Sequence, residues 1–131
     1  MHLSFKSEYA LIALTELARQ KKSCSLSELA VYCGTSPLFL QQIFSELKRN
    51  KIVTSVLGRG GGFFLAKDPE KISLAEVVRI FDEVIAPSRS VSKFHYRPTP
   101  IEKNPKAVKV FQEIRDRIVE ILEKKTILDL V

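Results

Sequence analysis

Apolar residues recur every three or four positions in five segments of the chain, a spacing typical of amphipathic helices. A fourth helix is predicted from Ser73, with apolar spacing as far as Ile85, and a fifth over residues 105–125. The fifth would be roughly 30 Å long at 1.5 Å per residue, which is long for a domain that already has four helices. The three earlier helices are predicted over residues 8–19, 26–33 and 37–49.

Serine, proline and glycine mark the ends of the short predicted helices. Ser25 and Ser73 each precede a glutamate by three positions, which is the spacing of a capping box with two reciprocal hydrogen bonds. Gly34 suits the left-handed conformation that ends a helix, and Ser36 is a favourable N-cap before Pro37. Only a tight Gly-Thr-Ser connection separates the second helix from the third, which is the arrangement of a helix-turn-helix.

Two short strands are predicted after the third helix, over residues 52–56 and 63–66, on either side of a glycine-rich loop. Four of the five glycines surround Arg59 in this loop, and such a density favours positive φ angles or a close approach of the backbone. Prolines, serines and threonines then indicate an exposed or mobile segment. The expected fold is mainly α with a small β-hairpin: a winged helix-turn-helix domain (1–85), a linker (86–104), and a dimerisation helix with a C-terminal segment (105–131).

The outer face of the third helix carries polar side chains suited to reading DNA. Gln41 and Gln42 can both donate to and accept from adenine, whereas Lys48 and Arg49 near the end of the helix suit phosphates. Arg59 at the tip of the hairpin could enter a minor groove. The alternative interpretation is a purely structural three-helix domain whose hairpin has no role in binding.

Charge and composition narrow the class of protein. Residues 44–67 hold five Lys or Arg against one Glu, within a net charge of +6, and this excess fits a polyanionic partner. No apolar run approaches the ~20 residues that cross a bilayer, and the start lacks a secretory signal, so we expect a cytoplasmic protein without a membrane partner.

His2 and His95 have no ligand at metal-binding spacing, and no catalytic triad can be assembled, so neither an enzyme nor a metal site is expected. Cys24 and Cys33 fit structural thiols, with redox sensing left open.

An apolar stripe follows one side of the predicted last helix. Ordinary core packing and a subunit interface would both produce it, but two-fold symmetric DNA readers need a dimerising element, which favours the interface. The expected interface residues are Val108, Phe111, Ile114, Ile118, Ile121 and Leu122.

The order of these motifs resembles the Rrf2 family of bacterial winged helix-turn-helix transcriptional regulators over nearly the whole chain. The most specific match is the Gly-x-Gly-Gly-Gly-aromatic wing motif at residues 58–63. Further matching segments, in the family's order, are residues 1–10, 34–36, 40–44, 72–74 and 126–130.

The resemblance implies a homodimer in which the long helix of each subunit crosses its partner. It also implies phosphate contacts from the N-terminal segment and base contacts from Leu38 beside the two glutamines. Together with the residue pattern, it gives the expected DNA-binding set: Ser4, Lys6, Tyr9, Ser36, Leu38, Gln41, Gln42, Ser45, Lys48, Arg49, Arg59, Gly60 and Gly61.

The chain also departs from the family pattern. Many members bind an iron–sulfur cluster through three cysteines placed before the long helix, and residues 86–104 contain none. Because such clusters need thiolate ligands, no cluster is expected, and the chain resembles the cluster-free branch. Gln41 replaces the family's usual glutamate, and Leu57 stands where the wing arginine usually lies, so Arg59 is expected to replace it.

The sequence therefore predicts a transcriptional regulator, expected to be a repressor, that binds a near-palindromic operator as a homodimer. Its expected partners are double-stranded DNA and a second copy of itself. A regulatory protein, or a small effector near Phe94, Tyr96 and Arg97, would supply the signal. The alternative is a winged-helix protein–protein interaction module controlled by a partner protein, which salt dependence of binding would distinguish.

Overall fold

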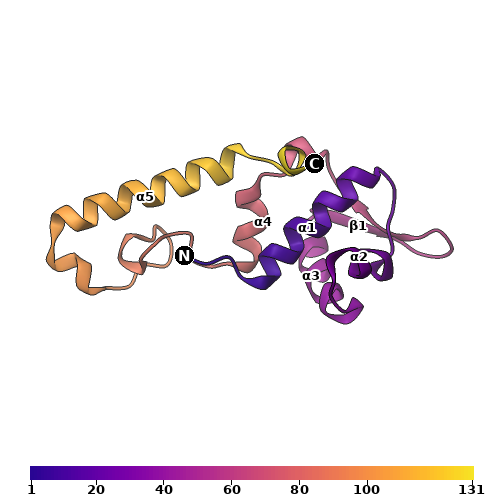
Figure 1. Cartoon of the computed structure of the whole chain (residues 1–131), viewed down its shortest axis with the longest axis horizontal. Helices are drawn as coiled ribbons and strands as arrows, with labels where there is room; N and C mark the ends of the chain where they lie inside the picture. The colour runs from indigo at the N-terminus through magenta and orange to yellow at the C-terminus, as the bar shows by residue number, and fades with distance from the viewer.

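The computed structural model describes all 131 residues as an elongated molecule, in which the long helix α5 runs from one end along one side past α4, and the β-hairpin projects at the other end (Figure 1). It confirms the mainly α-helical fold with one two-stranded antiparallel sheet. None of the helices is both long and apolar enough to cross a membrane. The α-helices and strands are α1 Phe5–Gln20, α2 Leu26–Cys33, α3 Pro37–Arg49, β1 Val53–Val56, β2 Gly62–Leu65, α4 Leu74–Phe81 and α5 Pro105–Lys124.

The hydrophobic core lies among α1 to α4 and the hairpin. It is a cluster of 17 buried residues, and α3 alone contributes Leu40, Ile43, Phe44 and Leu47, as its apolar spacing predicts. Ile127 joins this cluster from the C-terminal end of the chain, where its N–H donates to the carbonyl of Ile72 at 2.9 Å. The chain after α5 therefore returns to the core of the N-terminal part.

Helix α1 begins at Phe5, three residues before the predicted start at Glu8. Ser4 is its N-cap, and the hydroxyl of Ser4 accepts the N–H of Ser7 at 3.1 Å. The N–H of Ser4 in turn donates to the carboxylate of Asp82, at 3.2 Å to each oxygen. The earlier start therefore depends on a residue 78 positions away, which no local pattern reveals.

The serine N-caps of the other short helices are confirmed. The predicted reciprocal bond, in which the glutamate carboxylate accepts the N–H of the N-cap serine, is wrong for both capping boxes. Ser25 and Ser73 accept the N–H of the glutamate three residues on, each at 3.1 Å. The Glu76 carboxylate, however, binds the ammonium of Lys67 at 2.7 Å instead of returning to the helix start. Helix α4 also ends at Phe81, short of the predicted Ile85.

The hairpin pairs Val53 with Leu65 and Val56 with Gly62, which leaves a five-residue loop. Near the loop, strand β2 is tied to the connection between α1 and α2, because Cys24 and Phe63 exchange both backbone hydrogen bonds, at 2.8 and 2.9 Å. A Cβ on Gly62 would lie 2.4 Å from the carbonyl oxygen of Cys24, so only glycine fits this close approach.

The segment predicted as an exposed linker has structure of its own. It contains the short 3-10 helices η2 Arg89–Val91 and η3 Pro100–Lys103, and it buries Ala86 and Val91. Helix α5 packs on this segment and on α4, yet none of its 20 residues is buried. The domain boundaries at residues 85 and 104 stay predictions.

Candidate nucleic-acid interface

The outer face of α3 is exposed along its whole length. Leu38 has 69% of its surface exposed, and Gln41 and Gln42 are exposed with no hydrogen bond from either amide to the rest of the chain. Because the opposite face of α3 is fixed in the core, these side chains are presented on a rigid element. Their arrangement suits a helix that meets base edges in a major groove.

Other predicted α3 residues have partners within the chain. Ser36 caps the helix by accepting the N–H of Phe39 at 3.1 Å, and the Ser45 hydroxyl donates to the carbonyl of Gln41 at 2.9 Å. The Lys48 ammonium donates to the hydroxyl of Ser55 in β1 at 2.7 Å, which joins α3 to the hairpin. A further ion pair of 2.8 Å joins the exposed Arg49 to Glu46.

The N-terminal end of α1 lies beside α3. The rings of Tyr9 and Phe39 meet edge to face, with 5.6 Å between their centroids. Lys6 is exposed and makes no ion pair, so its charge is free for an anion. Ser4, by contrast, uses both its hydroxyl and its N–H to fix the start of α1. The fold thus brings the predicted phosphate-binding segment next to the predicted base-reading helix.

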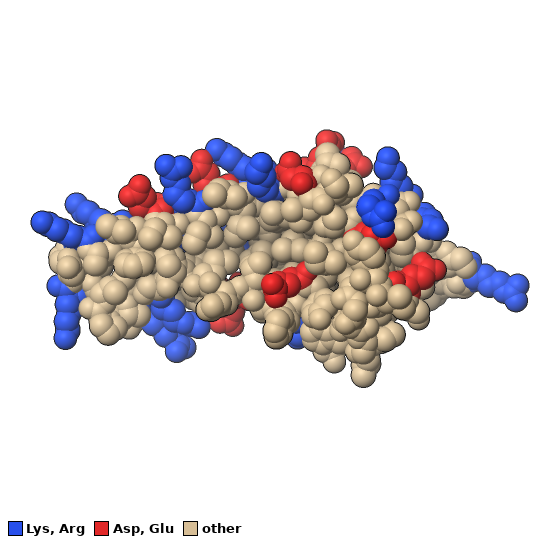
Figure 2. All heavy atoms as spheres, viewed as in Figure 1, with Lys and Arg blue, Asp and Glu red and all other residues tan.

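Arg59 projects from the free end of the hairpin. A turn closes between Gly58 and Gly61 through a 3.0 Å hydrogen bond, and Gly60 has the positive φ of 70° that its position in a type II turn requires. The only Lys or Arg of residues 57–61 is Arg59, which makes no ion pair, and Figure 2 shows a basic side chain extending from this end of the molecule.

The two predicted wing glycines have a structural role within the chain. The Ser23 hydroxyl donates to the carbonyl of Gly60 at 3.0 Å, which holds the loop against the α1–α2 connection. A Cβ on Gly61 would lie 2.3 Å from the carbonyl oxygen of Val56, so a side chain would distort the turn. Direct contacts of Gly60 and Gly61 with DNA stay predictions.

Sequence reasoning missed the residues that position this surface. Ser7 is fully buried, and its hydroxyl donates to Asp82 at 2.5 Å. A signal existed, because Ser7 occupies the apolar stripe of α1 ahead of Ala10 and Leu14, where a polar group needs a partner. Ser23 and Ser55, which hold the wing and Lys48, lie in segments without a comparable signal.

The two cysteines are free thiols, Cys24 buried and Cys33 partly buried. Burial raises the pKa of the Cys24 thiol and that of the Cys33 thiol, which disfavours the reactive thiolate. No group of three His, Cys, Asp or Glu side chains lies close enough to hold a metal ion. This donor set does not fit an iron–sulfur cluster, because only two thiols exist and both lie in the N-terminal part.

Comparison with known families gives one match over nearly the whole chain. The model of the Rrf2 family, described as an iron-dependent transcriptional regulator, matches residues 3–131. A putative HTH-type transcriptional regulator, rrf2-like, from Rhodobacter capsulatus is 33% identical over 96% of this chain and 89% of its own length. The HTH-type transcriptional regulator IscR of Cronobacter sakazakii is 36% identical over 71% of this chain, and the match spans only 59% of that protein.

Solved structures share the fold. CymR, the global cysteine regulator of B. subtilis, superposes with a TM-score of 0.85 at 26% identity, over 99% of this chain and 95% of its own. The IscR structure from T. potens superposes with a TM-score of 0.75 at 24% identity, over 99% of this chain and 85% of its own. The fold that this chain shares with these structures therefore includes the long helix α5 as well as the winged helix part.

Proposed function

This chain belongs to the Rrf2 family of transcriptional regulators, which are not enzymes, and we propose that it represses transcription from a near-palindromic operator to which it binds as a homodimer. DNA binding and transcription regulation follow from family membership. The sign of regulation, the symmetry of the operator and the dimer belong to the proposal.

The observation that carries the proposal is the two-sided character of α3. Its inner face contributes four fully buried side chains, while its outer face presents Leu38, Gln41 and Gln42 without intrachain hydrogen bonds from the glutamines. An apolar side chain can contact a thymine methyl group, and a glutamine amide can pair with adenine. The Tyr9–Phe39 contact and the Lys48–Ser55 bond place α1 and the wing next to this face.

Helix α5 supports the homodimer. Its residues Val110, Ile114 and Ile121 are 54%, 39% and 58% exposed, at a spacing that puts them on one side of the helix. A second copy that packed its own α5 there would cover them in an isologous interface. Of the predicted interface residues, Ile114 and Ile121 are exposed, whereas Val108, Phe111, Ile118 and Leu122 are half-buried on their own chain.

We further propose that the regulator works without an iron–sulfur cluster, as the donor set described above supports. Two-fold symmetry would place the two recognition helices about 34 Å apart, one turn of B-DNA. Residues 86–104, which hold no cysteine, would then serve another purpose than cluster binding.

Salt dependence of binding tests this function against the protein–protein alternative. We expect fluorescence anisotropy with a duplex of promoter DNA upstream of the gene to show affinity falling by about 10³-fold or more between 50 and 200 mM salt, because each neutralised phosphate releases counterions. A scrambled duplex of the same composition is the control for specific binding. Equal and salt-insensitive affinity for both duplexes would overturn the proposal in favour of an interaction module.

A further inference from the structure

A cavity of about 620 Å³ lies between α4, the segment that follows it and α5, away from the predicted DNA-binding face. Its volume is within the range of sites for small molecules. Of the three residues predicted near an effector, Phe94 contributes to the lining, whereas Tyr96 and Arg97 do not; the Tyr96 hydroxyl donates to Glu102 at 2.6 Å. The prediction of an effector near these three residues stays a prediction.

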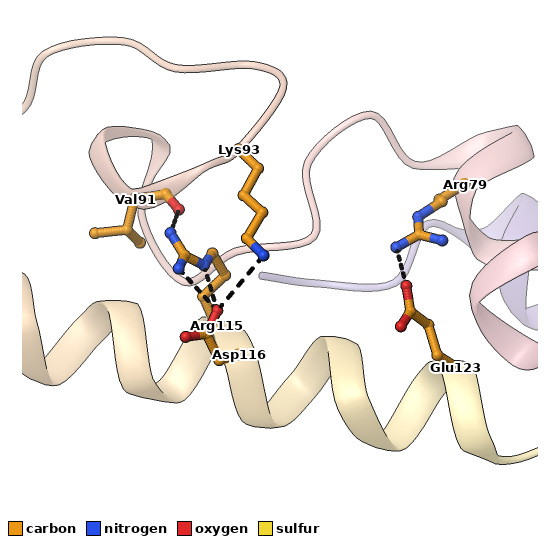
Figure 3. A network of polar contacts seen from close by, with 6 residues as sticks. All are labelled: Arg79, Val91, Lys93, Arg115, Asp116 and Glu123. Atoms are coloured by element: carbon orange, nitrogen blue, oxygen red, sulfur yellow. Dashed lines mark hydrogen bonds and ion pairs between the residues drawn. The ribbon is translucent and has the colours of Figure 1, made fainter.

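Two basic side chains that line this cavity, Arg115 of α5 and Lys93 of the segment after α4, lie close together, whereas Arg79 of α4 lies apart from them (Figure 3). The Arg115 guanidinium, whose side chain is only 14% exposed, donates to the carbonyl of Val91 at 2.8 Å and pairs with Asp116 at 2.7 Å. Lys93 lies 4.0 Å from the same carboxylate, so two cations share one anion there. This end of the cavity carries an excess positive charge.

Two carboxylates from the residues that follow α4 also contribute to the lining of the cavity. Asp82 and Glu83 both line it, and neither forms an ion pair with a basic side chain of this chain. Arg79, the nearest lining base in sequence, is already paired with Glu123 at 2.9 Å. Two uncompensated carboxylates beside a cavity favour an ammonium group there.

Apolar side chains complete the lining. Ile85 and Val119 lie in the wall, together with the largely exposed ring of Phe94. We propose that this cavity binds a small zwitterion, an α-amino acid with an apolar side chain, as the regulatory ligand of the DNA-binding surface. Its ammonium group lies against Asp82 and Glu83, and its carboxylate lies against Arg115 and Lys93.

Asp82 links this cavity to the DNA-binding surface. The same carboxylate that lines the cavity accepts the N–H of Ser4 and the hydroxyl of the buried Ser7, and so fixes the start of α1. An ammonium group at Asp82 changes how strongly the carboxylate holds Ser4 and Ser7. Lys6, a predicted phosphate contact, lies between these two serines in the sequence, so the change reaches the DNA-binding surface. The inference rests on the proposed function here, because it regulates that same surface.

Direct binding to the free protein tests the site without DNA. The standard L-α-amino acids are the probes, each titrated into the purified full chain and followed by saturation-transfer NMR and by the shift of the melting temperature. We expect at least one apolar member to bind with a millimolar or tighter dissociation constant. Its primary amine and its carboxylic acid analogue, each lacking one charged group, should bind at least about tenfold more weakly. Failure of every amino acid to bind would overturn the inference.

Matched variants locate the site. Glu83→Gln and Lys93→Gln each remove one charge from an exposed side chain, and both should weaken binding at least about fivefold. Glu113→Gln, on an exposed part of α5 outside the cavity, is the control and should leave binding unchanged. Equal affinity in all three variants would contradict the assignment of the cavity.

A second measurement separates this inference from the proposed function. Saturating amino acid should change the affinity for operator DNA by about fivefold or more, and Asp82→Asn, if its melting curve remains cooperative, should abolish that change. If the protein binds operator DNA but no amino acid binds to the protein, the inference is refuted and the proposed function stands. Amino acid binding without any operator binding would refute only the proposed function, and binding of both without mutual effect would refute the link through Asp82.

Discussion

Helices α3 and α5 have the same kind of amphipathic sequence and opposite surroundings. The 13 residues of α3 include four fully buried apolar side chains, whereas the 20 residues of α5 include no buried side chain at all. Both stripes have the spacing of one helix face. The difference teaches that apolar spacing shows which face is to be covered, but not whether the same chain covers it.

The largest effect is expected at Phe44 in the buried face of α3, which is fully buried and meets Phe63 edge to face, with 4.9 Å between the ring centroids. Phe44→Ala should lower the free energy of unfolding by about 3–5 kcal/mol, because it removes a large core side chain and leaves a cavity. Urea denaturation followed by circular dichroism measures this loss. Phe94→Ala, at a largely exposed ring, should cost less than about 1 kcal/mol, and equal costs would contradict the placement of the core.

The α5 side of the comparison is tested by charging its exposed stripe. Ile114→Glu with Ile121→Glu should produce a folded monomer, because a carboxylate in an apolar interface is costly. Loss of two-site binding should weaken operator affinity by about 100-fold or more. Analytical ultracentrifugation and anisotropy titration measure both effects. The control Gln112→Glu, at an exposed polar position, should remain dimeric, and a dimer in the double variant would disprove the interface.

The bond between Ser7 and Asp82 sharpens the comparison, because it fixes the N-terminal end of the well-packed region. Ser7→Ala should lower the free energy of unfolding by about 1.5–3 kcal/mol, the range for a hydrogen bond to a charged group. Ser27→Ala, at an exposed helical serine without such a bond, is the matched control. If the two variants differ by less than about 0.5 kcal/mol in urea denaturation, the bond does not stabilise the start of α1.

The smallest expected effect is at the wing. Arg59→Ala should weaken operator binding by about 0.5–1 kcal/mol and reduce the salt slope by about one, because a single exposed cation is lost. Gel-shift titration at several salt concentrations measures both values. Arg117→Ala removes the same charge from exposed α5 and should change neither value. Unchanged affinity of Arg59→Ala at physiological salt would refute its minor-groove role.

Local patterns predicted most of the fold. The N-cap serines, Gly34 and all four core residues of α3 were identified correctly, because each depends on neighbours within one or two helical turns. The start of α1 was missed because Ser4 binds Asp82, which is distant in sequence. The structure within residues 86–104 was missed because Val91 is buried and its carbonyl accepts a hydrogen bond from Arg115 of α5, a contact between elements that composition does not encode.

The site was predicted unevenly for a similar reason. Residue type and helix periodicity were sufficient to select Gln41 and Gln42, which are exposed on the outer face of α3. They could not show that Lys48 binds Ser55 or that Ser23 holds the wing, because these bonds join separate elements. The cavity beside α5 likewise arises only when α4, the following segment and α5 come together.

Selection of bound sequences from random duplex DNA by the purified full chain tests the central claim most directly. The account predicts recovery of one two-fold symmetric motif, with half-site centres about 10 base pairs apart and specific base preferences where Gln41 and Gln42 reach. Recovery of no motif, or of an asymmetric motif without a repeated half-site, would contradict a symmetric dimer that reads DNA through α3.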